Sequence, residues 1–141
     1  MIKIIAGGRK NAGWVAEACV EYEKRLRKPF EVEWQFVEED RLEGVVARCD
    51  ARDLVILLDE RGEMWDSAVL SKKLSAGLTS AKRVVFVIGG AYGFSEEMRT
   101  HAYACWSLSK LVFPHQICRV LVAEQIYRAQ EIYLGHPYHH E

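Results

Sequence analysis

Several features that mark common functional classes are missing from this sequence. Its four cysteines are far apart and none forms a CxxC pair, so we expect neither a zinc knuckle nor a dithiol redox site. The formal net charge of -1 excludes a global basic field, so a nucleic acid would have to bind a local patch. No apolar run approaches membrane-spanning length. These absences favour a cytoplasmic protein with reduced thiols that binds neither metal nor membrane.

The chain has 141 residues and a hydrophobic fraction of 50%, enough to build the core of one domain. Continuous apolar runs at 54–58 and 84–88 predict strands covered on both faces, and alternation over 30–37 predicts a half-exposed strand. Shorter strands are expected at 2–6 and 104–108, with residues 38–50 weakly helical. Strands that alternate with helices predict a single α/β domain over 1–141 with a mostly parallel sheet.

Four residues are placed to begin helices. Asn11, Asp66 and Ser95 are N-cap residue types that directly precede helical patterns. Pro114 suits the first position of a long helix that continues to about residue 134, because a proline there sacrifices no intrahelical bond. We therefore expect helices to begin close to these four residues.

Three loops at the carboxyl ends of strands are candidate ligand sites, because ligands of parallel α/β sheets bind at that edge. They follow Leu58, Ile88 and Leu108. The glycine turn at 89–93 allows close backbone approach, but it matches neither GxGxxG nor a P-loop, and a plain tight turn would look the same. The run 108–113 combines free backbone groups with bulky apolar side chains, which suits a flat heterocycle; an ordinary strand-to-helix connection has the same pattern.

The last helix is apolar on more than one side, so it is either deeply buried or meets a second subunit; we expect a homodimer. Glu124 and Arg128 are four residues apart, the spacing of a helical ion pair. The tail 136–141 is interpreted as a solvated terminus, as a metal site without a suitably spaced partner, or as a segment whose Tyr138 and His139 reach over an active site. A basic cluster at 24–28 is compatible with RNA, or with a merely solvated helix face.

Five segments together carry a resemblance to a known family. They are 57–62 (LLDERG), 86–93 (FVIGGAYG), 107–116 (SLSKLVFPHQ), 119–129 (RVLVAEQIYRA) and 136–140 (HPYHH), in that order. The chain closely resembles the RlmH family of ribosomal RNA large subunit methyltransferases, of the SPOUT or α/β-knot class, over essentially its whole length. The resemblance implies a C-terminal trefoil knot, although knots are rare in proteins. It also implies a homodimer that methylates N3 of a pseudouridine in 23S rRNA on assembled ribosomes, with S-adenosylmethionine as methyl donor.

The resemblance also implies roles for individual residues. Main-chain groups of three loops would hold the methyl donor, at Leu58, Gly89, Leu108, Ser109, Lys110, Leu111, Val112 and Phe113. Arg128, Tyr138 and His139 are the predicted catalytic residues, with Glu124 and His115 as further candidates for handling the N3 proton. The base is left unassigned, and we expect the tail of one subunit to close the pocket of the other.

Two departures from the family pattern affect this expectation. The segment 38–53 looks short for the family. Val112 stands where a threonine is common, so a hydroxyl near the methyl donor is missing, but contacts made by main-chain atoms should not be affected. Two other functions remain open at this point. One is a nucleotide-binding or dehydrogenase-like α/β module that uses the 89–93 turn, and the other is a non-catalytic RNA-binding dimer.

Overall fold

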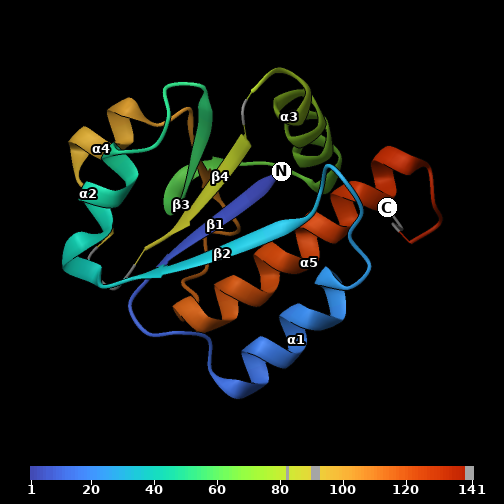
Figure 1. Ribbon diagram of the computed structural model, residues 1–141, viewed down its shortest axis with the longest axis horizontal. Coiled ribbons are helices and arrows are strands. Elements are labelled where there is room, and N and C mark those ends of the chain that lie inside the picture. The colour runs from blue at the N-terminus through green and yellow to red at the C-terminus, as the bar shows by residue number, and fades with distance from the viewer. Residues whose placement is uncertain (82, 90–92, 139–141) are drawn as a thin grey trace.

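The structure is a computed structural model that describes residues 1–81, 83–89 and 93–138. A sheet of parallel strands lies between two groups of helices (Figure 1). The elements in chain order are β1 (Ile2–Gly7), α1 (Gly13–Glu23), β2 (Val32–Val37), the 3-10 helix η1 (Glu39–Arg41), α2 (Leu42–Ala47), β3 (Asp53–Met64), α3 (Ser67–Ser80), β4 (Arg83–Ile88), α4 (Glu96–His101), β5 (Ala104–Ser107) and α5 (His115–Leu134).

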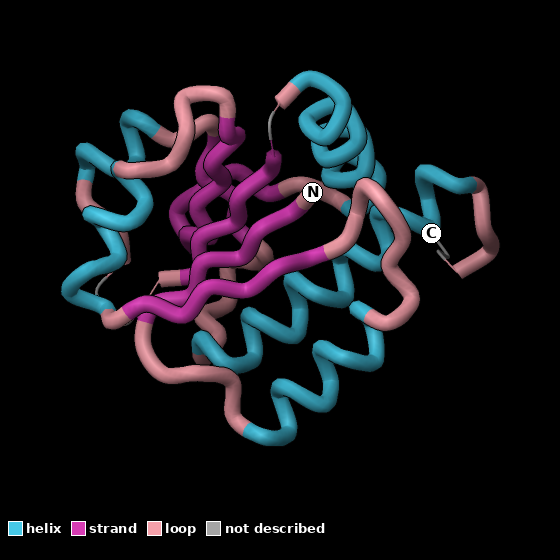
Figure 2. The backbone as a smooth tube through the Cα atoms, viewed as in Figure 1, coloured by secondary structure: helices cyan, strands magenta, loops and turns pink. Residues whose placement is uncertain are grey.

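The sheet has five strands in the order β2-β1-β4-β3-β5, and each neighbouring pair in this order is parallel. Figure 2 shows the strands side by side, with helices on both sides of them. The predicted α/β class with a mostly parallel sheet is confirmed. Because all strands point the same way, β3, β4 and β5 bring their carboxyl ends to one edge.

Alternate side chains of the central strands pack into two different hydrophobic cores, one on each face of the sheet, which explains the continuous apolar runs. Val84, Phe86 and Ile88 of β4 face the core formed with α3 and α5. Val85 and Val87 of the same strand face the core under α2 and α4. A strand buried on both faces must be apolar at every position, as the sequence analysis expected.

The predicted helix starts at Asp66 and Ser95 are confirmed. The Asp66 carboxylate accepts from the N–H of Val69 at 2.8 Å, and the Ser95 hydroxyl accepts from the N–H of Met98 at 3.2 Å. The prediction for Asn11 is wrong, because the N-cap of α1 is Ala12, which makes no side-chain cap. The carboxamide oxygen of Asn11 instead accepts from Arg119 at 3.1 Å, since a buried guanidinium competes for it.

Two predicted boundaries also differ. Pro114 is the N-cap of α5, one residue before the helix begins. The strand expected to end at 58 continues as β3 to Met64, with a register shift opposite β5 between Leu58 and Glu63. The extension escapes prediction because its residues 59–63 are polar or glycine, and pairing with β5 holds them in place.

The short segment before β3 forms η1 and α2 and packs with α4 on one face of the sheet. Among the described residues, no helix is both long and apolar enough to cross a membrane. The trefoil knot stays a prediction, because strand pairing reports neighbours and not the threading of one segment through another.

Candidate functional site

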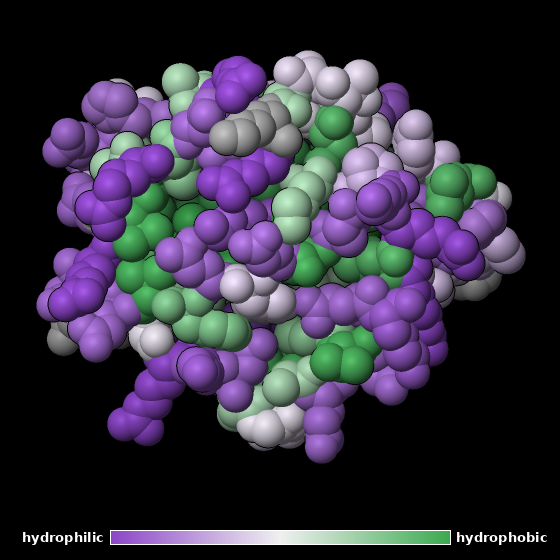
Figure 3. Space-filling model, in the orientation of Figure 1, coloured by the Kyte–Doolittle hydropathy of each residue, from purple (hydrophilic) through white to green (hydrophobic). Residues whose placement is uncertain are grey.

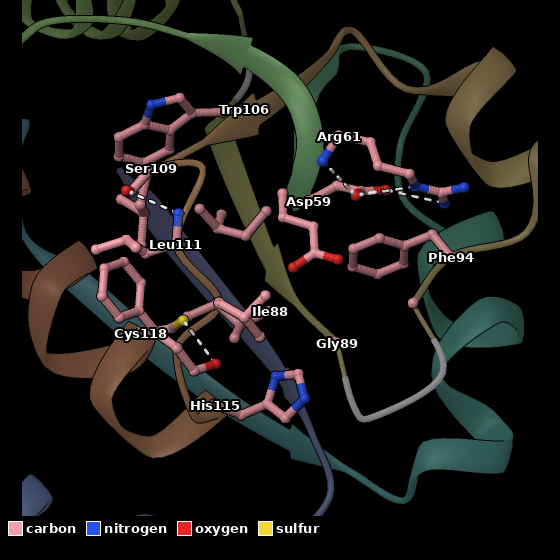
Figure 4. A pocket seen from close by; sticks show the side chains of 16 residues that line it. Asp59, Arg61, Ile88, Gly89, Phe94, Trp106, Ser109, Leu111, His115 and Cys118 are labelled. Atoms are coloured by element: carbon pink, nitrogen blue, oxygen red, sulfur yellow. Dashed lines mark hydrogen bonds and ion pairs between the residues drawn. The ribbon is translucent and has the colours of Figure 1, made fainter.

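A cavity of about 450 Å³ lies beside the bulge in β3 and the carboxyl ends of β4 and β5 (Figure 4). Three segments far apart in sequence form its wall: residues 58–61 at the bulge of β3, the turn after β4 and the connection from β5 into α5. Its described lining residues are Leu58, Asp59, Glu60, Arg61, Ile88, Gly89, Gly93, Phe94, Trp106, Leu108, Ser109, Leu111, Val112, Phe113, His115 and Cys118. The three predicted segments therefore converge on one cavity, although the first of them is a bulge within β3 and not a loop after a strand end.

Two serines shape the loop between β5 and α5. The Ser107 hydroxyl donates to the carbonyl of Ser109 at 2.8 Å, and the N–H of Leu111 donates to the Ser109 hydroxyl at 3.0 Å. These local bonds hold a turn without a regular element. The loop thus presents apolar Leu111 and Val112 to the outside, 68% and 76% exposed. Such large apolar side chains in solvent mark a surface that a ligand or another chain would cover.

The bulge in β3 places charged groups beside the cavity. The Asp59 carboxylate accepts from the N–H of Arg61 at 2.9 Å and pairs with the guanidinium of Arg99. Burial raises the pKa of Asp59, but the hydrogen bonds from Arg61 and the Arg99 charge outweigh it and hold the pKa below the ordinary value of 3.8. At neutral pH Asp59 is an anion committed to two arginines. Gly62 makes the bulge possible, because a Cβ there would lie 2.5 Å from the Cys105 carbonyl carbon.

Gly89 is tightly enclosed at the end of β4. A Cβ on Gly89 would lie 2.9 Å from Cζ of Phe94, whose ring is buried and also lines the cavity. The backbone of Gly89 can therefore reach a bound molecule only because no side chain intervenes. The rest of the predicted glycine turn, residues 90–92, lies outside the described residues.

A thiol at the base of the cavity is not an activated nucleophile. Cys118 comes from the first turn of α5, and its Sγ lies 3.9 Å from the Phe113 carbonyl oxygen. Burial raises the pKa of Cys118, so the group stays a neutral thiol at physiological pH. The cavity thus combines apolar side chains with polar groups and main-chain edges, an arrangement suited to holding a small molecule.

The cavity includes seven of the eight predicted donor-binding residues: Leu58, Gly89, Leu108, Ser109, Leu111, Val112 and Phe113. The eighth, Lys110, is exposed at the tip of the same loop and does not line the cavity.

The predicted catalytic residues lie at the other end of α5. Arg128 is 13 residues beyond His115, a distance of about 20 Å along the helix axis. Its guanidinium bonds the Glu124 carboxylate at 3.0 Å, the expected helical pair, and lies 4.8 Å from the ring centroid of Tyr138. Burial is the main cause that raises the pKa of Tyr138. Within one chain, Arg128 and Tyr138 are together but remote from the cavity; His139 lies outside the described residues.

Arg119 is a structural anchor that the sequence analysis did not identify. It is 1% exposed, and its guanidinium donates to the carbonyls of Gly7 and Arg9 at 3.1 and 2.7 Å. Gln116 assists by accepting from the N–H of Ala12 at 3.0 Å. Together they fix the loop after β1 against the start of α5, just below the cavity. The sequence could have indicated this role, because Arg119 is a charged residue within the apolar pattern of a helix expected to be buried, and a buried charge requires a hydrogen-bonding partner.

The basic cluster at 24–28 is partly neutralised. Lys24 and Arg25 both lie within ion-pair distance of Glu21, at 2.9 and 3.9 Å. Arg25 also lies 5.8 Å from the ring centroid of Tyr127, which connects this cluster to the tail end of α5. The positive charge of the cluster therefore gathers near Arg128 rather than near the cavity.

The described residues contain no group of three or more histidine, cysteine or acidic side chains placed to hold a metal ion.

Comparison with known proteins gives consistent matches. A family model described as "Predicted SPOUT methyltransferase" matches residues 1–139. The chain is 36% identical over 154 residues to the "Ribosomal RNA large subunit methyltransferase H" of Chromobacterium violaceum, with 99% of each chain covered. It is 39% identical over 155 residues to the protein of the same name from Parabacteroides distasonis, again with 99% of each covered.

A solved structure shares the fold. It is described as a probable methylase family protein from Haemophilus influenzae Rd KW20. The alignment has a TM-score of 0.59 at 14% identity and covers 95% of this chain and 66% of the other. At that identity the match bears on architecture alone.

Proposed function

This chain belongs to the SPOUT methyltransferase family, and we propose that it transfers a methyl group from S-adenosylmethionine to N3 of a pseudouridine in 23S rRNA. The observation that carries the proposal is the convergence of the β3 bulge and the ends of β4 and β5 on one cavity, which has apolar side chains, polar groups and a glycine edge. The curated relatives, each named as a ribosomal RNA methyltransferase, support the choice of substrate.

The cavity fits the methyl donor. The apolar side chains of Leu58, Ile88 and Leu108 can cover the faces of an adenine ring, while main-chain groups of Gly89 and Ser109 can read its edge. S-adenosylmethionine supplies an electrophilic methyl group on a sulfonium, so the chain itself needs no nucleophile. Holding donor and acceptor in line accounts for most of the expected acceleration, about 7–11 kcal/mol in well-aligned systems.

The acceptor requires a group that stabilises negative charge. The N3 imide proton leaves to solvent before or during attack, N3 bonds the methyl carbon as the carbon–sulfur bond breaks to leave a neutral thioether, and a cation beside the base favours the imide anion that attacks. Arg128 is suited to that role, because its guanidinium is permanently charged and held by Glu124 and Tyr138. The raised pKa of Tyr138 keeps its phenol protonated at neutral pH, so it can donate a hydrogen bond but cannot serve as the base.

A complete site needs two copies of the chain. Arg128 is about 20 Å from the cavity end of its own helix, and a rigid helix cannot bring the two together. An isologous contact with the two α5 helices antiparallel would place the tail of one copy beside the cavity of the other. The exposed apolar side chains Trp14, Val20 and Ile117 on α1 and α5 support such a contact. In Figure 3, apolar surface also reaches solvent in the lower part of the molecule, where Figure 1 places α1 and α5.

The experiment is methylation of ribosomes by the purified protein with isotopically labelled S-adenosylmethionine, followed by mass spectrometry of 23S rRNA fragments. We expect the label on N3 of one pseudouridine. Arg128→Ala should abolish incorporation while calorimetry shows unchanged affinity for S-adenosylmethionine. Arg41→Ala is the matched control, because Arg41 is an exposed arginine of η1, on the α2 and α4 side of the sheet.

Two results would reject the proposal and identify another function. Binding of NAD in preference to S-adenosylmethionine would indicate a dinucleotide-binding module. Ribosome binding with no labelled methyl in the rRNA would indicate a non-catalytic RNA-binding dimer.

A further inference from the structure

Glu131 joins the last turns of α5 to the segment that follows the helix. Its carboxylate is largely buried, with 12% of the side chain exposed. One oxygen accepts from the Tyr127 hydroxyl at 3.0 Å, and the other lies 3.1 Å from Nδ1 of His136. Its carbonyl oxygen also accepts from the N–H of His136 at 2.9 Å. Gly135 makes this possible, because its φ of 73° reverses the chain at the helix end.

Tyr127, which Glu131 holds, contacts the predicted catalytic residue Tyr138. The rings of Tyr138 and Tyr127 meet edge-on with their centroids 4.8 Å apart. The Arg128 guanidinium lies over the Tyr138 ring, 4.8 Å from its centroid. Tyr127 is buried, with the ring of Tyr22 6.2 Å away on its other side. The tail residue Tyr138 is thus placed by contacts with two side chains of α5, one of which is held by Glu131.

We propose that Glu131 is a positioning residue that fixes Tyr127 and the tail, and thereby holds Tyr138 against Arg128 for action on the RNA base. The inference rests on the proposed function, in which Arg128 and Tyr138 act on the acceptor. Nothing in it requires Glu131 itself to touch the RNA.

The expected loss of activity in Glu131 variants comes from the hydrogen bond to Tyr127 and not from the ion pair with His136. The imidazole of His136 is 54% exposed, so its ion pair with Glu131 is worth little by itself. The Tyr127 hydroxyl is different, because loss of the Glu131 carboxylate would remove the acceptor of its O–H proton and leave it only the interaction with Arg25. We expect the Tyr127 ring to move in response, and the edge contact with Tyr138 to be lost with it.

The test compares Glu131→Ala, Glu131→Gln and Tyr127→Phe with wild type, using Glu96→Ala as control. Glu96 is a strongly exposed glutamate on α4, on the opposite side of the sheet. Glu131→Ala should lower kcat on ribosomes by about tenfold or more, from a lost buried hydrogen bond and the disordered tail. The dissociation constant for S-adenosylmethionine should not change, because the predicted donor contacts come from main-chain groups of the cavity segments and not from the tail. Glu131→Gln should recover most of kcat, since its amide oxygen can still accept from Tyr127.

A second measurement is independent of activity. Fluorotyrosine at position 138 should give a displaced 19F resonance in wild type, where the neighbouring ring shields it, and a resonance near the free amino acid value in Glu131→Ala. Tyr127→Phe keeps the ring packing and removes only the hydroxyl, so it gives a smaller shift and reports on the bond even if Glu131→Ala fails to fold.

The inference is overturned if the 19F resonance is unchanged in both Glu131→Ala and Tyr127→Phe, or if kcat is unchanged in Glu131→Ala. A loss of kcat matched by a weaker affinity for S-adenosylmethionine would also overturn it, since it would indicate a general structural defect. A wild-type protein that transfers no methyl rejects the proposed function instead, and the resonance still decides whether Glu131 orders the tail.

Discussion

Mixing two impaired variants should restore activity if each site is built from two chains. Gly89→Val weakens donor binding in the cavity, and Arg128→Ala removes the predicted catalytic cation. A heterodimer of the two has one site in which the intact cavity of the Arg128→Ala chain meets the intact tail of the Gly89→Val chain. Random reassortment makes about half of the dimers mixed, each with one good site of two, so about a quarter of wild-type activity is expected.

The effect of Gly89→Val can be worked from the structure. The new Cβ would lie 2.9 Å from Cζ and 3.0 Å from Cε1 of Phe94, and the Phe94 ring is only 7% exposed. The Phe94 ring lines the cavity, so a displaced ring would change the shape of the cavity, and overpacking of this kind costs about 1–3 kcal/mol. If that cost falls on the bound state, the affinity for S-adenosylmethionine drops by about 5- to 150-fold. Calorimetry on the single variant measures this directly.

The assay is labelled-methyl incorporation into ribosomes after the two variants are mixed, with native mass spectrometry to show that heterodimers form. A mixture of Gly89→Val with Leu58→Trp is the matched control, because both changes damage the cavity and no mixed dimer has an intact site. Confirmed heterodimers of the first pair without recovered activity would refute the two-chain site and require catalysis within one chain.

Three further predictions concern stability, measured at fixed protomer concentration. Arg119→Met should lower the free energy of unfolding by about 3 kcal/mol in urea titrations, because two backbone carbonyls and a carboxamide lose a buried charged donor; a loss below about 0.5 kcal/mol would show that the anchor is dispensable. Gly62→Ala should cost about 1–3 kcal/mol and lower the melting temperature, since its Cβ would overlap the Cys105 backbone, whereas Gly44→Ala on α2, with nothing nearer than 3.9 Å, should not. The pKa of Asp59 in the folded protein lies below the ordinary 3.8. Its contribution to the free energy of unfolding is therefore complete above about pH 4 and is lost as the pH falls through the folded pKa. Asp59→Asn should flatten the acid limb of the curve of stability against pH, and an unchanged limb would count against the pairing with Arg61 and Arg99.

Much of the site could be predicted from local patterns. The apolar runs at 54–58 and 84–88 require strands covered on both faces, and parallel strands bring their ends to one edge, so the meeting of the loops at Leu58, Gly89 and Leu108 follows. The caps at Asp66 and Ser95 were equally predictable, because each depends on atoms only three residues away.

Long-range competition decided the rest. Asn11 has the side chain of an N-cap, yet it serves Arg119, 108 residues away in sequence. The β3 extension exists because β5 pairs with it, and Glu131 acquires its role only when Gly135 turns His136 back onto the helix. The sequence alone determined where most strands and helices lie and which segments line the cavity, since these depend on residues close along the chain. Only the tertiary structure decided that one straight helix, α5, separates the cavity from Arg128, because that separation depends on where the whole helix lies.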